Sequence, residues 1–272
     1  MKFFLSEAHL NFYYRMDIAT FEIEKELLGQ GYSLVLGVDE AGRGPLAGPV
    51  VAAAVLLKNS LCHSGLDPES RIEQDGIKIL KQVQDDKYWN LVRDSKKLSE
   101  KQREKVFDFI HENFHVGIGL CNHETIDHIN ILEASFLAMK KAVQNLKREI
   151  EKEKKDAALE VELPIEGSTS KSDEKCIVLV DGNKQIPNFS MEQKAIVGGD
   201  RLVKSIAAAS IVAKVTRDRM MMEMHEKYSQ YGFDKHKGYG TKLHMDALAQ
   251  YGPCEIHRKS FAPVKKASKA VI

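Results

Sequence analysis

The stretch Leu34-Val35-Leu36-Gly37-Val38-Asp39-Glu40-Ala41-Gly42-Arg43-Gly44-Pro45 decides the fold and contains the first candidate site. The apolar run over residues 34–38 predicts a buried strand. It ends in two adjacent carboxylates, Asp39 and Glu40, and a turn with glycines on both sides of an arginine follows. Because neighbouring strand side chains point to opposite faces, one of the two acids is expected to face the core. A lone buried carboxylate is costly unless it is paired or binds a metal, so this pair is a candidate site.

Length and composition exclude several classes of protein. The 272 residues suffice for one large domain or two modest ones, and a hydrophobic content of 43% supports a substantial core. No apolar run approaches the ~20 residues that span a bilayer, and residues 1–14 lack the features of a signal peptide. We therefore expect no membrane association. Met16 is a possible alternative start.

The cysteines do not form a recognisable pattern. They are scattered, with no paired spacing, at Cys62, Cys121, Cys176 and Cys254. Neither a zinc site nor a small disulfide framework is predicted. We expect free thiols in a cytoplasmic protein.

The basic residues gather toward the C-terminus. Residues 199–272 contain 14 Lys and Arg against 7 Asp and Glu, whereas the rest of the chain contains 26 against 32. Such asymmetry is typical of proteins with a polyanionic partner. On charge alone, a solvated basic surface is the simpler explanation.

Several further elements are predicted around the first strand. Residues 50–57 form a partner strand whose small side chains indicate close packing of another element. Ser99 and Gln102 have the spacing of a capping box, so a helix is expected to begin there. The remaining predictions are strands at 114–121 and 176–180 and helices at 17–31, 131–146 and 206–218. The polar segments 59–88 and 147–174 are expected to be surface insertions.

Three more acids follow apolar stretches. Asp181 ends the strand at 176–180, but Asp-Gly-Asn is also good turn chemistry. Asp200 stands just ahead of the small-residue helix, where a helix N-cap is about as plausible as a metal ligand. Asp218 lies later in that helix between two arginines, and a solvated acid is the favoured interpretation there. In open α/β sheets the ends of strands are where ligands bind, which favours Asp181 as a partner of Asp39 and Glu40.

The C-terminal stretch 233–261 is predicted to be loop-rich and basic. Its segment Lys235-His236-Lys237-Gly238-Tyr239-Gly240-Thr241 places an aromatic side chain between glycines and lysines. This arrangement suits stacking of Tyr239 on a sugar or base beside phosphates. A tyrosine buried in the core is the competing interpretation.

The acids point to a particular chemistry. Carboxylates without a Cys/His cluster favour a hard cation, Mg²⁺ or Mn²⁺. Combined with a basic surface, they suggest phosphodiester hydrolysis, in which two such ions could activate water and stabilise the leaving 3′ oxygen.

The motifs of the chain resemble those of bacterial ribonuclease HII, in the same order and from about residue 17 to 264. The resemblance begins at Asp39-Glu40-Ala41-Gly42-Arg43-Gly44-Pro45-Leu46-Ala47-Gly48-Pro49-Val50. It continues through 94–99, 130–132, 180–183, 199–200, 208–218, 238–241 and 257–261. The departures are the N-terminal extension 1–16 and the two insertions. The resemblance therefore implies a catalytic domain at 17–264, followed by a tail at 265–272.

The resemblance also implies a fold and roles for particular residues. The fold would be an α/β ribonuclease H-like mixed β-sheet flanked by helices, with a helical C-terminal part. The catalytic, metal-binding acids would be Asp39, Glu40, Asp181 and Asp200, the last being preferred to Asp218. Gly42, Arg43 and Gly44 would read the ribose 2′-hydroxyl, Tyr239 would stack on the sugar after the RNA–DNA junction, and Lys96 would hold phosphate.

The activity implied is that of a metal-dependent endoribonuclease. It would cut the RNA strand of RNA–DNA hybrids and cleave at ribonucleotides embedded in duplex DNA, leaving a 5′-phosphate and a 3′-hydroxyl. The protein is expected to be a monomer. Two other classes are weighed against it. A hybrid-binding protein without activity is disfavoured because all the expected acids are present. A nucleotide-binding oxidoreductase is disfavoured because the glycine spacing does not fit the dinucleotide fingerprint.

Overall fold

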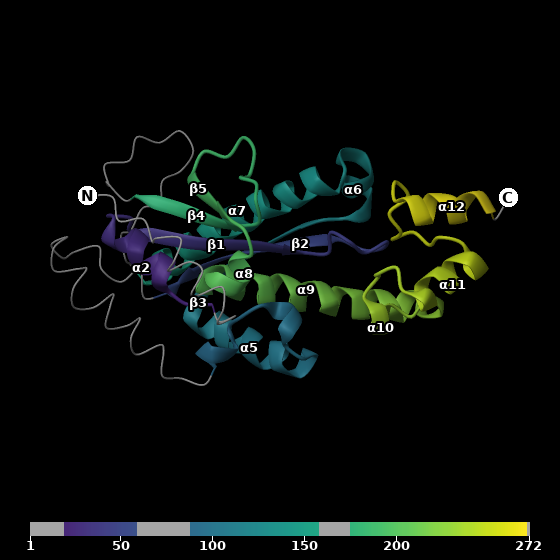
Figure 1. The fold of residues 1–272 in the computed structure, drawn as a ribbon, viewed down its shortest axis with the longest axis horizontal. Coiled ribbons are helices and arrows are strands. Elements are labelled where there is room, and N and C mark those ends of the chain that lie inside the picture. Colours follow the sequence, from purple (N-terminus) through teal and green to yellow (C-terminus); the bar gives the residue numbers. More distant parts are fainter. Residues whose placement is uncertain (1–18, 59–87, 158–174, 271–272) are drawn as a thin grey trace.

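The computed structural model describes residues 19–58, 88–157 and 175–270, and a five-stranded mixed sheet lies at its centre (Figure 1). The strands are β1 (Leu34–Ala41), β2 (Val50–Leu57), β3 (Phe114–Cys121), β4 (Cys176–Asp181) and β5 (Glu192–Ile196). Their order across the sheet is β3-β2-β1-β4-β5. β1 pairs antiparallel with β2 and parallel with β4, so the chain must cross over between β1 and β4. The predicted mixed sheet is confirmed.

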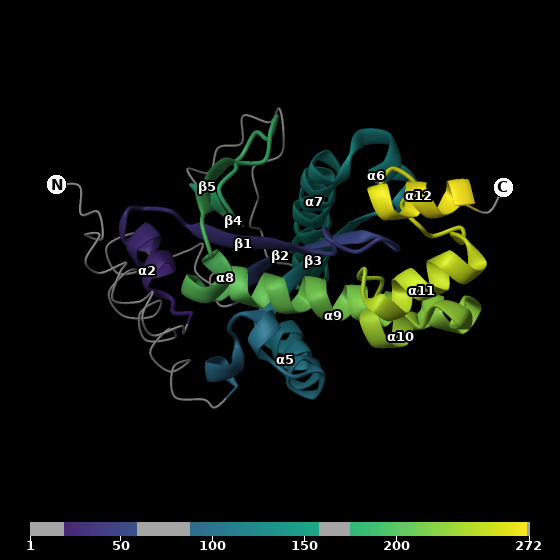
Figure 2. The same cartoon turned by 45° about the vertical axis from the view of Figure 1, so that its right-hand side comes forward.

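Helices cover both faces of this sheet (Figures 1 and 2). α7 (Ile131–Ala157) packs on one face, α9 (Lys204–Lys227) packs on the other, and α5 (Glu100–Asn113) packs against α9. The shorter helices are α2 (Glu22–Gly29), α6 (His123–Ile129), α8 (Gly199–Leu202), α10 (Phe233–His236), α11 (Lys242–Tyr251) and α12 (Ala262–Ala270). Single 3-10 turns occupy Trp89–Leu91, Ser95–Lys97 and Ser229–Tyr231. The helices α10 to α12 lie together beyond one end of the sheet (Figure 1).

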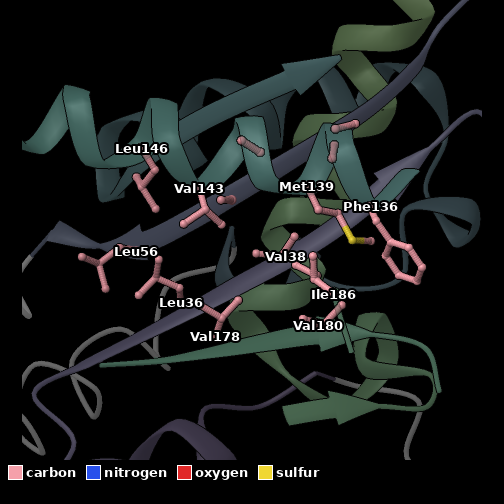
Figure 3. Close-up of a cluster of buried hydrophobic side chains, with 14 of the residues drawn as sticks. Leu36, Val38, Leu56, Phe136, Met139, Val143, Leu146, Val178, Val180 and Ile186 are labelled. Carbon is pink, nitrogen blue, oxygen red and sulfur yellow. The ribbon is translucent and has the colours of Figure 1, made fainter. Parts of the chain in front are cut away.

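The alternation of side chains along the strands divides the core into two layers. Leu36 and Val38 of β1 point to the α7 face, where they pack with α7 residues such as Val143 (Figure 3). Gly37, which lies between them, faces α9 on the other side of the sheet. A Cβ atom at Gly37 would lie 2.3 Å from the backbone of Ser205, so only glycine allows α9 to approach β1 so closely. This parity directs Asp39 toward α9.

Most predicted elements are present in the structure, with some corrections. The capping box of Ser99 and Gln102 is confirmed at the start of α5. Residues 147–157 of the second expected insertion belong to α7, and Ile150 is buried in the core. The stretch 233–261 was predicted to be loop-rich, yet it contains the helix α11. The rest of the two insertions, at 59–87 and 158–174, and the N-terminal extension lie outside the described residues.

Two compositional expectations concern cysteines and membranes. In the described residues Cys121 and Cys254 are free thiols, whereas Cys62 lies outside them. Among the helices of the described ranges, none combines the length and hydrophobicity that a membrane span requires.

Candidate active site

Three of the four predicted acids gather at one edge of the sheet, on its α9 face. Parallel pairing aligns Val38 of β1 with Val180 of β4, so the next residues, Asp39 and Asp181, end level with each other and on the same face. Asp200 lies in α8, the single turn that precedes α9, and its backbone N–H donates to Asp181 Oδ1 at 3.4 Å. Asp200 therefore stands ahead of the small-residue helix α9, as predicted, but it lies within α8 and is not a helix N-cap, a position that Gly198 occupies.

The fourth acid, Glu40, follows Asp39 and completes the group from the other side of the strand. Its backbone N–H donates to Asp39 Oδ1 at 2.7 Å. Its side chain is 10% exposed, and Arg43 Nη1 lies 3.1 Å from its Oε1 atom. We use the name acidic cluster for Asp39, Glu40, Asp181 and Asp200.

The acidic cluster concentrates negative charge at a position where Asp39 and Asp200 are buried and Glu40 and Asp181 are partly buried. Burial, followed by the charges of Glu40 and Asp181, raises the pKa of Asp39 well above its ordinary value. Burial also raises the pKa of Glu40, against the opposing effect of Arg43. Burial and the charge of Asp181 raise the pKa of Asp200, and Lys96 opposes this shift. Such mutual repulsion is relieved when a cation binds among the carboxylates.

The cations that the chain itself supplies to the acidic cluster are exposed. Lys96 Nζ lies 3.6 Å from Asp200 Oδ2, and the Lys96 side chain is 80% exposed. Burial lowers the pKa of Lys96, yet the net shift is upward because four carboxylates lie around it: Asp200, Asp39, Asp94 and Asp181. Exposed pairs of this kind contribute little stability. Lys96 and Arg43 therefore leave most of the buried charge uncompensated.

The donor set fits a divalent cation in its chemistry. All four side chains present carboxylate oxygens, which are the ligands that Mg²⁺ and Mn²⁺ prefer. Within the described part of the chain, no three His, Cys, Asp or Glu side chains already form a metal-binding arrangement. The acidic cluster thus has the ligand chemistry and the charge of such a site.

Ser210 is a residue of this site that the sequence did not reveal. It lies on α9, is buried, and its hydroxyl hydrogen-bonds to Asp39, which lowers the pKa of that carboxyl. Its Oγ atom also lies 3.0 Å from Ser95 Oγ, next to Lys96 in sequence. α9 is rich in small residues, so the sequence does not show whether a serine in it is there to form a hydrogen bond or to allow close packing.

The glycine turn and the C-terminal tyrosine lie beside each other. A Cβ atom at Gly44 would lie 3.6 Å from Tyr239 Cε1. Gly42 has a φ of +100°, and a side chain there would collide with Arg217. Tyr239 is 42% exposed, so the competing interpretation of a core tyrosine is wrong. We use the name glycine–tyrosine surface for Gly42, Arg43, Gly44 and Tyr239.

Two buried arginines hold this surface in place. Arg258 donates to the carbonyls of Gly42, Arg43, Gly48 and Pro49, at 2.6, 3.1, 3.0 and 3.1 Å. Arg217 donates to the carbonyls of Ala47, Pro49 and Lys237, at 3.1, 2.9 and 2.9 Å. Both had been counted in the basic C-terminal part, but neither is exposed to a polyanion. The available signal was the position of Arg217 one helical turn after Ala213, on the inward side of α9.

Asp218 differs from the prediction of a solvated acid. It is buried, and it pairs with Lys214 at 2.7 Å and with Arg103 at 3.8 Å. Because two cations neutralise it, it has no uncompensated charge to offer a metal. The arginines beside it in sequence are not its partners.

The fold corresponds to that of known proteins. The ribonuclease H2 of Pyrococcus horikoshii superposes with a TM-score of 0.56 and 24% identity, covering 87% of this chain and 97% of that one. The structure of Bst-RNase HIII in complex with Mn²⁺ gives a TM-score of 0.56 at 16% identity, covering 89% of this chain and 72% of that one. The protein thus has the α/β fold of the type 2 ribonucleases H.

Sequence comparison specifies the family. The model of the ribonuclease HII family matches residues 36–64 and 80–264. The ribonuclease HII of Caldicellulosiruptor bescii is 46% identical over 89% of this chain and 92% of its own length. That of Acetivibrio thermocellus is 44% identical over 94% of this chain and 78% of its own. The chain belongs to the ribonuclease HII family and is a hydrolytic nuclease that acts on the RNA of RNA–DNA hybrids.

Proposed function

We propose that this enzyme also cleaves at single ribonucleotides embedded in duplex DNA, leaving a 5′-phosphate and a 3′-hydroxyl. The observation that carries the proposal is the direct junction of the acidic cluster with the glycine–tyrosine surface. Glu40 belongs to the first and Arg43 to the second, and their side chains are 3.1 Å apart. The group that would recognise one ribose then lies next to the group that would cut.

The acidic cluster would perform the hydrolysis. Asp39, Glu40, Asp181 and Asp200 would hold two ions of Mg²⁺ or Mn²⁺, which supply a nucleophilic water and stabilise the leaving 3′ oxygen. Ser210 would keep the Asp39 carboxylate turned toward α9. Lys96, which is exposed beside Asp200, would bind a phosphate of the substrate, since an ammonium group is a compact partner for phosphate.

The glycine–tyrosine surface would select the ribose. The 2′-hydroxyl is the group that distinguishes RNA from DNA, and it both donates and accepts hydrogen bonds. The backbone of the exposed Gly44 and the side chain of the exposed Arg43 would contact it, whereas Gly42 is buried against Arg217 and would contribute by shaping the turn. Tyr239 would stack on the following sugar, with the positive charges of Arg217 and Lys214 at 5.9 and 5.8 Å from its ring.

The division of the chain is part of the proposal. Residues 17–264 would form the catalytic domain, and the family model, which ends at residue 264, supports this boundary. Residues 1–16 and 265–272 would be extensions outside it.

A cleavage assay on a duplex with one ribonucleotide tests the proposal. Wild type is incubated with Mg²⁺, with Mn²⁺ and with EDTA, and the products are sized and tested for a 5′-phosphate. We expect a single metal-dependent cut at the ribonucleotide and none in the all-DNA duplex. Asp181→Asn should abolish it, because the substitution removes one charge while preserving the shape. Asp246→Asn, an exposed acid of α11, is the matched control and should cut normally. Cleavage of continuous hybrids alone would contradict the proposal.

A further inference from the structure

Three buried histidines form a group that contacts the main chain of Tyr239, outside the acidic cluster. His236 and His244 stack with ring centroids 4.6 Å apart, and His244 Nε2 lies 2.9 Å from His257 Nε2. His244 and His257 are completely buried, and His236 is nearly so. Neither the hydrolysis nor the proposed ribose contacts use these rings, although polar rings are seldom buried without a partner.

The partners of the rings determine which nitrogen of each carries the proton. The backbone N–H of Cys254 donates to His257 Nδ1 at 3.0 Å, so that nitrogen is unprotonated and His257 Nε2 carries the proton. His244 Nδ1 lies 2.9 Å from the carbonyl oxygen of Tyr239, which can only accept, so His244 Nδ1 carries the proton. The two rings then meet with one donor and one acceptor, and both are neutral.

The result is a chain of hydrogen bonds with one direction. It runs from the Cys254 amide through His257 and His244 to the carbonyl of Tyr239. Burial lowers the pKa of His244 and of His257 to about 4, which keeps both rings neutral near neutral pH. A second proton on His244 would place two donors against each other at the 2.9 Å contact, and a second proton on His257 would oppose the Cys254 amide.

The segment that contains His257 also binds the glycine turn, residues 42–44, of the glycine–tyrosine surface. Arg258, the residue after His257, binds the carbonyls of Gly42 and Arg43. Its backbone N–H donates to the carbonyl of Leu46 at 2.9 Å, which ties the segment to the loop that follows the glycine turn. The dipeptide His257-Arg258 therefore contacts the glycine side directly and is linked to Tyr239 through His244.

We propose that His244 and His257 are positioning residues for ribose selection, acting through the main chain of Tyr239. The proposal rests on the function proposed above for Tyr239. The rings set where the Tyr239 backbone sits relative to the glycine turn, whose carbonyls Arg258 binds. Losing the hydrogen bond to Tyr239 would misplace the stacking ring without touching the acidic cluster.

Two substitutions at His244 separate positioning from simple packing. The amide nitrogen of Asn lies close to the place of a histidine Nδ1, so His244→Asn keeps a donor for Tyr239. The amide of Gln lies near the place of Nε2, so His244→Gln loses that donor although it fills more of the space. We expect kcat/KM on the one-ribonucleotide duplex to fall about tenfold in His244→Gln, as for one lost hydrogen bond, and less than about threefold in His244→Asn. Packing alone predicts the reverse order.

A double-mutant cycle with Tyr239→Ala shows whether His244 acts through the tyrosine. All variants are assayed with the metal at saturation and at a temperature where circular dichroism shows them folded. The loss caused by His244→Gln should vanish in the Tyr239→Ala background, and continuous RNA–DNA hybrid should be cut with less change than the single-ribonucleotide duplex. A loss that persists in full would overturn the inference while leaving the proposed function intact. Wild-type activity of Tyr239→Ala alone would overturn the role of Tyr239 and the inference together.

Nitrogen-15 NMR of the histidine rings gives a reading that does not depend on activity. At pH 7 we expect His244 protonated at Nδ1 and His257 at Nε2. The opposite tautomer in either ring would overturn the inference, because the chain of donors would then be broken.

Discussion

The buried negative charges and the buried positive charges of this protein are treated in opposite ways. In the acidic cluster, Asp39 and Asp200 are buried beside other acids, and the nearest cations, Lys96 and Arg43, are exposed. Arg217 and Arg258 are buried just as deeply, but main-chain carbonyls surround their guanidinium groups. Among the described residues, the acids have mainly exposed cations as ionic partners, whereas the arginines have buried main-chain acceptors.

This difference indicates that the acidic cluster serves the reaction and that the buried arginines serve the fold. A buried charge with its hydrogen bonds satisfied fixes the conformation of the groups that it binds. A buried charge without sufficient partners is costly to the folded state and is relieved by something that binds there. The acidic cluster is therefore expected to control activity, and the arginines are expected to control stability.

The largest expected effect is on activity, and it appears when the charges of two buried acids, Asp200 and Asp218, are removed one at a time. Asp200→Asn removes one carboxylate from the acidic cluster, whereas Asp218→Asn removes a carboxylate that Lys214 and Arg103 already neutralise. We expect kcat to fall on the order of 10³-fold in the first variant, comparable to losing an electrostatic group of an active site. Asp218→Asn should keep activity within about threefold of wild type, since a change of that size is under 1 kcal/mol.

The pair is compared in one cleavage assay at saturating Mg²⁺. Loss of activity in Asp218→Asn, with Asp200→Asn unaffected, would show that the fourth acid had been assigned to the wrong residue.

The second effect is on stability. Arg258→Leu leaves the carbonyls of Gly42, Arg43, Gly48 and Pro49 without their common donor, and we expect it to lower the free energy of unfolding by about 3 kcal/mol. Arg219→Leu is the matched control, because Arg219 forms an exposed pair with Glu104 and its loss should cost less than about 1 kcal/mol. Urea denaturation followed by circular dichroism measures both. Equal losses would refute the architectural role of the buried arginine.

The smallest effect is stabilisation of the wild type by a divalent cation, and it depends on pH. The folded state raises the pKa of Asp39, Glu40 and Asp200, so without metal these groups stabilise the fold at low pH and that stability is lost as pH rises through the raised pKa. A bound cation replaces the protons. We expect Mg²⁺ or Mn²⁺ to raise Tm by a few degrees, corresponding to about 1–3 kcal/mol, and the increment to grow with pH.

Differential scanning calorimetry with and without metal measures this increment, and Asp181→Asn should reduce it. An increment that shrinks as pH rises would contradict the assignment of the carboxylates as ligands.

Much of the fold and of the candidate site could be predicted because the information is local. The apolar runs specified four of the five strands, and the capping residues specified the start of α5. Two of these runs, β1 and β4, each end in an acid. Because the two strands pair in parallel with Val38 opposite Val180, Asp39 and Asp181 lie level with each other. β5 was not predicted, since three of its five residues are polar and only Ile196 is buried.

The remaining features depend on contacts between residues far apart in the chain. The sequence by itself determined the order of the elements and the residue types of the acidic cluster. Only the tertiary structure decided which charges were neutralised: Asp218 meets Arg103 from α5, and Arg258 meets carbonyls more than 200 positions earlier. An exposed arginine and a buried arginine are the same residue type and can have similar neighbours in the sequence. What distinguishes them is the set of donors and acceptors that folding brings within hydrogen-bonding distance.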